Sequence, residues 1–581
     1  MTDRREYMRE YKRRYRAAKN ITKHDGDAFL SLSCLSVEEA DAIQSGAITG
    51  WSLIFENGDE LHGGDVSSLL DGFKSVKTRN TIYVCNLKVW GRFFVVEAER
   101  RKMTVSDNTA VKNTYRVVVN ATGDWNGFEF NLDGNRIFIK SFSEIIRSPL
   151  DKAFKDFCGG ALSDDADNTT IARAMYFIMQ SFRASLKKLS GGVSFTANTI
   201  SGYAQKLCEI IAGKGCPEYG RDVYKAFFPE IPREYGDDLR AAKVYRSGWN
   251  YMHPEAVNYT GDGYILDVNS FYPSIYAERL PVGDLRKSPY VIYEMEKPES
   301  ERDYGIFKVM ELSAHIKPGA VPTIQIINYN DCRTKYLTDV NYTGGEPFML
   351  DTFDIDLLYK NYDVDYLTLE YGYFAKLRHV DFLENYAHLL FNRKRSHKGD
   401  AVGATAKYLL NSLSGRFGLN SYRREVDIVK NNNYNGEYKY IGEKGYLPAA
   451  IYINSVGRYR INEYVRICGD RFLYSDTDSI IIKGDEIPKE LQQYIGQELG
   501  QLSVKRFTAC KFFGLKCYGV ETLFDGWQWT IAGASPQMLK ELKDDVHAGQ
   551  VLRGGVVPKM YPNGTIAFKE REFTLARKMI F

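Results

Sequence analysis

The chain lacks the long hydrophobic runs of membrane proteins and the cysteine patterns of metal-binding or disulfide-rich proteins. No apolar run reaches the roughly 18 residues that span a bilayer, and we recognise no secretory signal. The nine cysteines are odd in number and form no Cys-x-x-Cys. Cys510 and Cys517 are too far apart for the usual zinc spacing. We therefore expect reduced thiols, no membrane partner and a cytoplasmic location.

An excess of charge of one sign is also missing. The 581 residues carry a formal net charge of +3, which excludes a dominant attraction of the whole molecule to polyanions, so any nucleic-acid binding must use local grooves. Hydrophobic residues make up 44% and charged residues 26%. These proportions exclude a disordered chain and allow about three to five compact domains.

The first 25 residues are rich in lysine and arginine. Tyr7, Tyr11 and Tyr15 recur every four residues there, which places them on one helical face. A helix that binds phosphates or a partner protein and a solvated, frayed terminus both fit this pattern.

The order of apolar patterns indicates α/β organisation. Residues 28–125 read as strands rich in Ile, Val, Tyr and Thr, and residues 168–189 as a long helix with one apolar face. Residues 384–418 predict two antiparallel helices, because Gly399 can end the first and Asp400 can cap the second.

Further along the chain, a hairpin is expected. Val426–Lys430 and Tyr438–Ile441 read as its two strands, with a polar turn between them.

Two short segments place acids beside apolar strands. Tyr264–Pro273 delivers Asp267 at the end of a strand, and Phe472–Ile482 reads as a hairpin with Asp476 and Asp478 at its tip. Such acids are costly unless something neutralises them. Mg²⁺ does so with one or two carboxylates plus substrate phosphates, and two metals about 3.5–4 Å apart support in-line phosphoryl transfer. An isolated Asp-x-Asp turn is nevertheless more often an Asx-turn.

The second of the two predicted helices carries a third motif, Lys407–Gly418. Lys407 and Asn411 are four residues apart and share a helical face. Lys407 offers a point charge to a triphosphate, and Arg395 near the basic tip offers another. A solvent-facing lysine is the alternative interpretation of Lys407.

In order and spacing, these segments resemble the polymerase motifs of family B DNA polymerases, most of all the protein-primed subgroup of phages and linear plasmids. The family patterns Dx2SLYP, Kx3NSxYG and YxDTDS read here as Asp267–Pro273, Lys407–Gly415 and Tyr474–Ser479. Tyr245–Gly248 resembles the YxGG linker before the palm. Lys516–Tyr518 resembles the KxY motif that holds the primer.

The resemblance implies an α+β multidomain fold, in which an exonuclease-like, RNase H-like α/β domain precedes a right-hand polymerase. Val321–Ile326 looks like part of the insertion that contacts a terminal protein, and the expected hairpin takes the place of the insertion that encircles DNA. The implied domains are the exonuclease-like domain 1–205, palm 206–280 and 448–535, first insertion 281–383, fingers 384–420, second insertion 421–447 and thumb 536–581.

The resemblance also implies a template-directed DNA polymerase and its site. Two Mg²⁺ ions, with Mn²⁺ as an alternative, would be held by Asp267, the Val268 carbonyl and Asp478, with Asp476 as a further catalytic acid. The incoming dNTP would be bound by Tyr272, which excludes a 2′-hydroxyl, and by Arg395, Lys407 and Asn411. DNA would be bound by Tyr245, Arg246, Gly248, Ser412, Gly415, Thr477, Lys516 and Tyr518, and by Asn86 and Lys88 of the N-terminal domain.

The implied partners are primer–template DNA, dNTPs and a terminal protein whose hydroxyl starts synthesis. The protein would act as a monomer with strand displacement, in the host cytoplasm if it is phage-encoded. A polymerase that starts from a nucleic-acid primer or from none remains an alternative. A non-catalytic DNA-binding relative is a second alternative, against which the three acids speak.

The polymerase motifs depart from the family at two positions. The tyrosine of Kx3NSxYG is Ser414 here, which removes an aromatic wall of the base-pair pocket. The basic residue often found four positions before the motif lysine is Gly403. Loss of that cation weakens the triphosphate grip or shifts it to Lys398.

The exonuclease-like domain departs further, because its metal-binding acids are missing. Phe29–Ser36 has no DxE, Trp90 stands where an acid should follow Asn86–Lys88, and Thr169 and Thr170 occupy the helix position of the last acid. A two-metal site without carboxylates does not hold Mg²⁺ firmly. We predict that proofreading is lost, while Asn86 and Lys88 could still bind single-stranded DNA or the priming protein.

Overall fold

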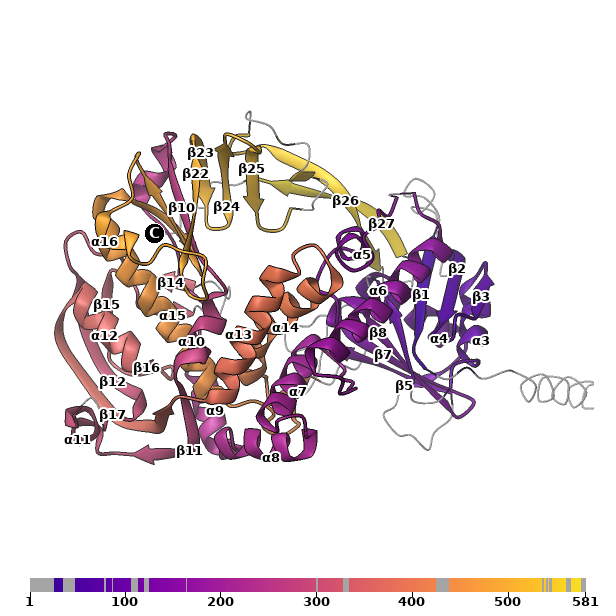
Figure 1. Ribbon diagram of the computed structural model, residues 1–581, viewed down its shortest axis with the longest axis horizontal. Coiled ribbons are helices and arrows are strands. Elements are labelled where there is room, and N and C mark those ends of the chain that lie inside the picture. Colours follow the sequence, from indigo (N-terminus) through magenta and orange to yellow (C-terminus); the bar gives the residue numbers. More distant parts are fainter. Residues whose placement is uncertain are drawn as a thin grey trace, which may run out of the picture.

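The computed structural model shows an elongated molecule with the N-terminal sheet at one end and the palm-like sheet at the other (Figure 1). Helices fill the space between these two sheets. The structure describes residues 24, 26–34, 48–77, 80–85, 87–105, 113–119, 125–163, 165–298, 301–327, 334–424, 438–534, 538–539, 542, 546–560 and 566–575. The predicted basic N-terminal helix lies outside these residues.

The N-terminal part forms an eight-stranded mixed sheet in the order β3-β2-β1-β4-β8-β7-β6-β5. Alternate residues of its first strand face opposite sides, since Leu30 packs into one hydrophobic core and Phe29 into another. The strands are β1 (Ala28–Cys34), β2 (Ile48–Phe55), β3 (Glu60–Gly63), β4 (Thr81–Val84), β5 (Thr104–Val105), β6 (Thr114–Val119), β7 (Trp125–Leu132) and β8 (Asn135–Ser141).

Helices cover both faces of this sheet. The expected long helix is present as α6 (Asn168–Leu189), whose side-chain cap is Asp167, and it packs on β1 and β2. Helices α3 (Val66–Phe73) and α4 (Leu87–Arg100) contribute side chains to the core on the other face.

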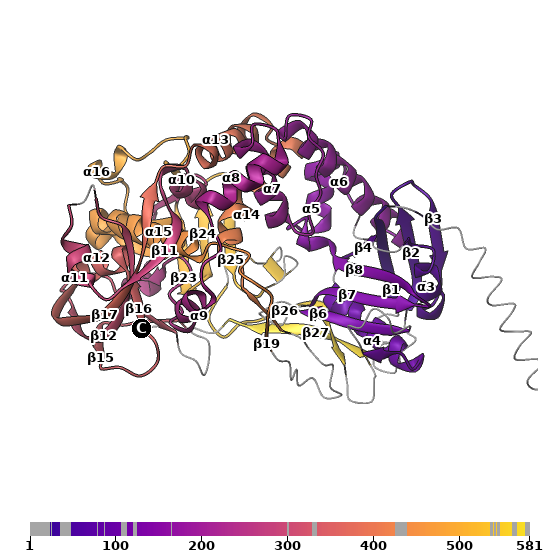
Figure 2. The ribbon, with the colours of Figure 1, turned by 90° about the horizontal axis from the view of Figure 1, so that it is seen from below.

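A bundle of helices joins the two ends of the molecule (Figure 2). Helix α9 (Arg233–Ala241) lies apart from it. The bundle contains α5 (Leu150–Cys158), α7 (Ile200–Ala212), α8 (Pro217–Phe227), α13 (Asp381–Ser396) and α14 (Ala401–Phe417). The last two are the predicted helical hairpin. As expected, Gly399 has a positive φ of 93°, and the Asp400 carboxylate accepts hydrogen bonds from the N–H groups of Val402 and Gly403. Helix α14 packs against α5, α6 and α7.

The palm-like sheet is antiparallel in the order β22-β10-β21-β20-β9. Its strands are β9 (Asn250–Met252), β10 (Gly263–Val268), β20 (Phe472–Asp476), β21 (Ser479–Lys483) and β22 (Leu502–Phe507). Helices α10 (Phe271–Glu278) and α15 (Leu447–Cys468) pack together, and α15 also contacts β21.

A second antiparallel sheet occupies the range predicted as the first insertion. It contains β11 (Leu280–Ser288), β12 (Tyr304–Ile316), β15 (Asp339–Tyr342), β16 (Met349–Asp351) and β17 (Tyr362–Arg378), and α12 (Thr352–Asn361) follows β16. Smaller elements of this region are α11 (Val291–Glu296), β13 (Gln325–Ile327) and β14 (Thr334–Tyr336). The domain boundaries themselves stay predictions.

The expected hairpin differs in its pairing. Strand β19 (Tyr438–Tyr440) pairs with β18 (Tyr422–Arg424), a segment that sequence reasoning did not choose. The predicted strand Val426–Lys430 lies outside the described residues.

The C-terminal strands return toward the N-terminal domain. A three-stranded sheet of β23 (Ala509–Gly514), β24 (Cys517–Thr522) and β25 (Gly526–Ile531) leads into a ribbon of β26 (Val551–Met560) and β27 (Ile566–Thr574). This ribbon reaches α4 (Figures 1 and 2). None of the helices in the described part of the chain combines the length and hydropathy needed to cross a lipid bilayer.

A buried ionic cluster ties the second sheet to the palm. The Asp354 carboxylate of α12 accepts hydrogen bonds from Arg458 of α15 at 2.7 Å and from Arg246 at 3.2 Å. Burial alone would raise the pKa of Asp354, but the two guanidinium groups hold it below its usual value. All three side chains are at most 5% exposed, so each charge depends on the others for compensation.

Arg458→Ala is expected to lower the free energy of unfolding by about 3–5 kcal/mol, because it leaves Asp354 without its nearest cation. The matched control is Arg466→Ala on the same helix, which removes an exposed pair with Glu463 and should cost at most about 1 kcal/mol. Urea unfolding of both variants measures the difference. Equal stabilities for the two variants would contradict the role of the cluster.

Candidate active site

The register of the palm sheet brings the two predicted metal-binding acids together. Asp267 of β10 pairs with Ser479 of β21, the residue next to Asp478. The Val268 N–H donates a hydrogen bond of 2.9 Å to the Asp478 carbonyl oxygen. Val268 and Asp478 are more than two hundred positions apart in the sequence, yet a backbone hydrogen bond joins them directly.

Burial and neighbouring acids make both carboxylates favour a nearby cation. Burial, followed by the negative charge of Asp478, raises the pKa of Asp267 to about 6, and Lys394 partly offsets this. Burial and the charge of Asp476 also raise the pKa of Asp478. Within the described residues, neither carboxylate has an ion-pair partner. A divalent cation would supply the missing charge.

Asp476 behaves differently, because Lys516 neutralises it. The Lys516 ammonium donates to the Asp476 carboxylate at 2.7 Å. In the described parts of the chain, no group of three or more His, Cys, Asp or Glu side chains could hold a metal ion. Two free carboxylates still fit Mg²⁺, which commonly takes one or two from the protein and its other ligands from substrate phosphates and water.

The turn between β20 and β21 is fixed by its backbone. Thr477 has a positive φ of 62°, and its N–H donates to the Trp249 carbonyl oxygen at 3.0 Å. The Asp478 N–H donates to the Asp476 carbonyl oxygen at 2.7 Å. The turn therefore presents Asp478 from a rigid tip.

The predicted primer-binding motif lies beside this tip. The Lys516 N–H donates to the Tyr474 hydroxyl at 2.9 Å. The Tyr518 ring lies 4.9 Å from the Tyr474 ring and stacks on Phe512 at 5.7 Å. The structure thus brings the Tyr474–Ser479 motif into contact with the Lys516–Tyr518 motif.

Tyr272 is held in place next to the acids. Its ring stacks on Phe271 at 5.8 Å, and its hydroxyl is hydrogen-bonded by the Gly248 backbone. A Cβ on Gly248 would lie 3.0 Å from the Tyr272 hydroxyl oxygen and 2.6 Å from the Thr477 methyl group. The linker glycine therefore lets the first and last motifs approach each other.

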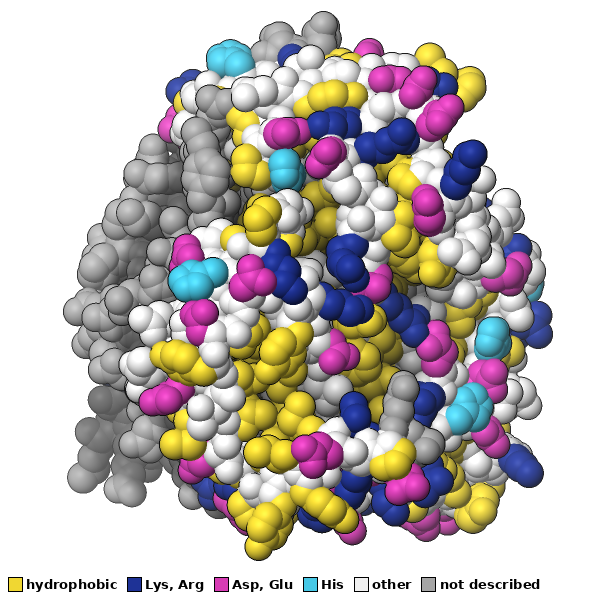
Figure 3. All heavy atoms as spheres, turned by 90° about the vertical axis from the view of Figure 1, so that its left-hand side faces the viewer, with side chains coloured by type: hydrophobic (Ala, Val, Ile, Leu, Met, Phe, Trp, Pro, Cys, Tyr) yellow, Lys and Arg dark blue, Asp and Glu magenta, His cyan; other side chains and the backbone are white. Residues whose placement is uncertain are grey.

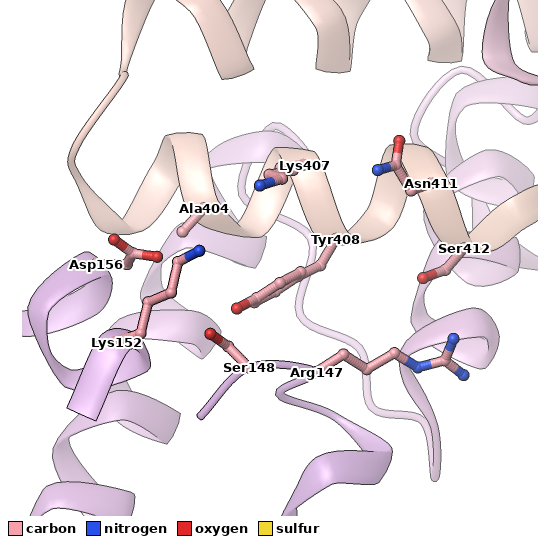
Figure 4. Close-up of a pocket in the computed structure, with 9 residues that line it drawn as sticks. All are labelled: Arg147, Ser148, Lys152, Asp156, Ala404, Lys407, Tyr408, Asn411 and Ser412. Atoms are coloured by element: carbon pink, nitrogen blue, oxygen red, sulfur yellow. The ribbon is translucent and has the colours of Figure 1, made fainter. Parts of the chain in front are cut away.

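A basic cavity of about 270 Å³ lies where α14 faces the N-terminal domain (Figure 4). Figure 4 shows Arg147, Ser148 and Lys152 on one side and α14 on the other. The lining residues on α14 are Ala404, Lys407, Tyr408, Asn411 and Ser412, and Asp156 is a further one. The predicted nucleotide ligands Lys407 and Asn411 thus share this wall with Ser412.

The remaining predicted contacts vary in accessibility. Tyr245 is 39% exposed. A Cβ on Gly415 would meet no atom within 4 Å, so this glycine faces open space. Asn86 lies outside the described residues, as does the side chain of Lys88.

Arg246 is the clearest correction. It is 5% exposed, pairs with Asp354 and donates to the Met349 carbonyl oxygen at 2.7 Å. Its guanidinium is therefore used inside the protein, and the prediction that it binds DNA is wrong. Arg395 is also engaged, since it pairs with Glu498 at 2.7 Å.

Sequence reasoning missed the neighbour of Arg395. Lys394 continues the buried stripe of Ala387, Leu390 and Phe391 on α13, and its ammonium donates to the Ser270 hydroxyl at 3.0 Å. Its helical phase was the available signal, because a residue three or four positions after two buried ones faces inward.

The N-terminal domain has a polar cluster in place of the expected acids. Ser31 donates to the Asn168 side-chain oxygen at 2.9 Å, and the Asn168 amide donates to the Ser33 hydroxyl at 2.9 Å. Ser52 and Thr169 are joined by a 3.0 Å hydrogen bond. Trp90 packs at the edge of the hydrophobic core. These positions carry hydroxyls, an amide and an indole, none of which is an anionic ligand.

Figure 3 shows the face on the side of the palm and the second sheet. Lys and Arg side chains gather around a hollow near the middle of this face, with fewer acids among them. The small net charge of +3 therefore conceals a local concentration of positive charge, which is what polyanion binding requires.

Comparisons with known proteins agree with this arrangement. The family described as DNA polymerase type B, organellar and viral, matches residues 172–494, more than half of the chain. The DNA polymerase of Bacillus phage phi29 is 25% identical over 530 residues, which are 85% of this chain and 88% of that protein. The DNA polymerase of Streptococcus phage Cp-1 is 24% identical over 325 residues, 52% of this chain and 55% of its own length.

Solved structures show the same fold. The orthorhombic crystal form of Phi29 DNA polymerase has a TM-score of 0.78 at 20% identity and covers 94% of this chain and 100% of its own. Its complex with primer–template DNA and incoming nucleotides has a TM-score of 0.76 at 21% identity, with the same coverage. The predicted multidomain α+β fold of a right-hand polymerase is thereby confirmed.

Asp267→Asn is expected to stabilise the metal-free protein above about pH 6. The pKa of Asp267 in the folded state, about 6, lies above its ordinary value of 3.8, so the charged carboxylate opposes folding at higher pH. The difference from the wild type should shrink as the pH falls from about 6 to about 4 and disappear below 3.8, where the carboxyl group becomes protonated in both states.

Because Asp267 remains accessible to solvent, the expected gain near neutral pH is about 1 kcal/mol. Urea unfolding in a chelator, near pH 7.5 and near pH 4, measures it. A variant no more stable than the wild type near pH 7.5 would show that the two carboxylates do not strain the fold.

Proposed function

The chain belongs to the organellar and viral type B DNA polymerases and is a DNA-directed DNA polymerase. We propose that it extends a primer 3′-hydroxyl by two-metal phosphoryl transfer at Asp267 and Asp478. The observation that carries this proposal is the pairing of β10 with β21, which unites two unneutralised carboxylates at one strand end. Little covalent chemistry is needed from the protein, because positioning and charge supply most of the catalysis.

The chain's own residues divide the work. Asp267, Asp478 and the Val268 carbonyl would hold the cations, with Mg²⁺ the first choice and Mn²⁺ an alternative. Bound divalent cations supply Lewis acidity to the attacking hydroxyl and to the leaving pyrophosphate. Asp476 keeps Lys516 in place, which directs that lysine and Tyr518 toward the primer end.

The nucleotide pocket uses Tyr272, Lys407 and Asn411. Tyr272 would stack under the sugar and exclude a 2′-hydroxyl, and the Gly248 backbone fixes its hydroxyl for that purpose. Lys407 would contact the triphosphate. Arg395 could join it only after leaving Glu498.

DNA would pass the remaining predicted contacts. The related Phi29 DNA polymerase has been solved with primer–template DNA and with incoming nucleotides. By analogy, we assign DNA contacts to Tyr245, Gly248, Ser412, Gly415, Thr477, Lys516 and Tyr518. Because binding rests on phosphate contacts, it should weaken as the salt concentration rises.

We further propose that a terminal protein supplies the first hydroxyl, and that the enzyme works as a monomer with strand displacement in the host cytoplasm. The second sheet, which falls in the range expected for the family's priming insertion, supports this. Three exposed apolar side chains gather at its helix α11 and the residue before it, where Tyr290, Ile292 and Tyr293 are 73%, 73% and 67% exposed. Exposed apolar clusters commonly mark protein contacts.

The stretch that suggested this insertion has another role. Val321, Thr323 and Ile324 are at most 7% exposed, and Trp249 donates to the Pro322 carbonyl oxygen at 3.1 Å. The part of this stretch up to Gln325 thus packs between the second sheet and the palm, so a priming protein would bind elsewhere on the insertion. A deoxynucleotide covalently linked to the priming protein is the product that distinguishes this route from nucleic-acid priming.

We also propose that the N-terminal domain has no proofreading activity. The hydroxyl and amide groups at its expected metal site satisfy one another by hydrogen bonds, and none supplies negative charge. Asn86 and Lys88 are retained as candidate contacts for single-stranded DNA or for the priming protein.

Replacing either acid should abolish primer extension. Asp267→Asn and Asp478→Asn each remove a charge needed to hold the metals, so the rate should fall at least about a hundredfold, equivalent to several kcal/mol. Single-nucleotide extension of a labelled primer measures this. As a control, Asp485→Asn changes an acid beyond the end of β21 and should extend normally. Wild-type rates in both active-site variants would refute the proposal.

Proofreading is tested separately with a 3′-labelled single strand and Mg²⁺. We expect no release of the labelled nucleotide from the wild type beyond that of a chelated sample. Using Asp478→Asn as the background removes any contribution from the polymerase site. Mg²⁺-dependent release that persists in this variant would mean that the N-terminal domain is a nuclease.

A further inference from the structure

Lys394 is a cation whose place in the fold is not explained by packing alone. It extends the inward stripe of α13, whereas its neighbours Arg393 and Arg395 are exposed. Its ammonium donates to the Ser270 hydroxyl at 3.0 Å and lies 5.9 Å from the centre of the Phe391 ring. A lysine directed inward in this way usually neutralises an acid or binds an anionic ligand.

No carboxylate in the described part of the chain forms an ion pair with Lys394. Burial and the positive charge of Lys407 lower the pKa of Lys394, and the smaller effect of Asp267 opposes them. The ammonium is therefore near enough to both the motif lysine of α14 and Asp267 for their charges to act on it. A partly buried cation beside another cation favours an anion in the space that they share.

The fold also shows why a cation is needed from this position. In the family pattern a basic residue often stands four positions before the motif lysine, where this chain has Gly403. A Cβ on Gly403 would overlap the His397 carbonyl oxygen, because the helical hairpin closes tightly there. No side chain can occupy that position without moving the tip.

The surroundings add to the positive field. Ser270 stands at the start of α10 with a positive φ of 50°, and no side chain caps the first turn of that helix. The start of this helix therefore lacks a side-chain acceptor, and a helix N-terminus favours an anion. Arg395, the alternative donor on α13, is held by Glu498.

We propose that Lys394 binds the terminal phosphates of the incoming dNTP, in place of the cation that Gly403 excludes. This inference rests on the proposed two-metal site and assigns a further ligand of its substrate. Lys394 is one residue from Arg395 in sequence but lies on a different helical face, so the two make separate contributions.

The test compares three variants in single-nucleotide incorporation at saturating primer–template. Lys394→Ala should raise the KM for dNTP about 10-fold to 100-fold, the loss of one charge-assisted hydrogen bond, with a smaller change in kcat. Lys394→Arg should recover most of the affinity. Arg393→Ala removes an exposed cation of the same helix and should leave the KM unchanged.

Inhibition by pyrophosphate gives a second readout, because the same phosphates form the leaving group. Its inhibition constant should rise in Lys394→Ala by a similar factor, while the Kd for primer–template DNA stays constant. If instead the Mg²⁺ requirement rises and the KM for dNTP does not, Lys394 serves Asp267 and the inference fails. It also fails if Arg393→Ala raises the KM for dNTP as much as Lys394→Ala does.

The outcome is separable from that of the proposed function. Asp478→Asn should lose incorporation at any dNTP concentration, whereas Lys394→Ala should be rescued by excess dNTP. Activity in Asp478→Asn would refute the two-metal site. A normal KM in Lys394→Ala, with an inactive Asp478→Asn, would refute only the role of Lys394.

Discussion

Electrostatic repulsion between Asp267 and Asp478 is the constraint on which the rest of the site depends. Two carboxylates remain together only if the backbone holds them. The antiparallel pairing of β10 with β21 holds them here, and it includes a hydrogen bond from the Val268 N–H to the Asp478 carbonyl oxygen. The neighbouring groups then follow from this pairing. Lys516 neutralises Asp476, and the Gly248 backbone fixes the Tyr272 hydroxyl. Helices α13 and α14 supply the nearby cations Lys394 and Lys407.

The two ends of the molecule treat polar groups in opposite ways. At the N-terminal sheet, Ser31, Ser33 and Asn168 are hydrogen-bonded to one another. This group of side chains is therefore stable without a bound ion. At the palm, charges of equal sign face each other without a partner in the described residues. A charge that is partly buried and unpaired is costly, so the two unneutralised carboxylates of the palm are a physical reason to place the chemistry there.

Local patterns predicted much of this arrangement. The hairpin of α13 and α14 follows from Gly399 and Asp400, and the acidic tip follows from apolar residues on both sides of Asp476–Asp478. Other features depend on contacts between distant segments, which periodicity does not encode. From the sequence alone, Arg246 is expected to be a surface residue of a linker. In the structure it is buried beside Asp354 and Arg458. Lys394 was overlooked beside Arg395 for a related reason, since both are basic and only the helical phase separates them.

The cluster of Arg246, Asp354 and Arg458 has an evolutionary consequence. Its members come from three distant stretches of the chain, yet none can be exchanged alone without stranding a charge in the interior. Amino-acid replacements at these three positions must therefore occur together during evolution. Recombination that replaces the sheet carrying Asp354 with one from a distant relative would succeed only if both arginines were inherited compatibly, so this sheet is not a freely transferable module.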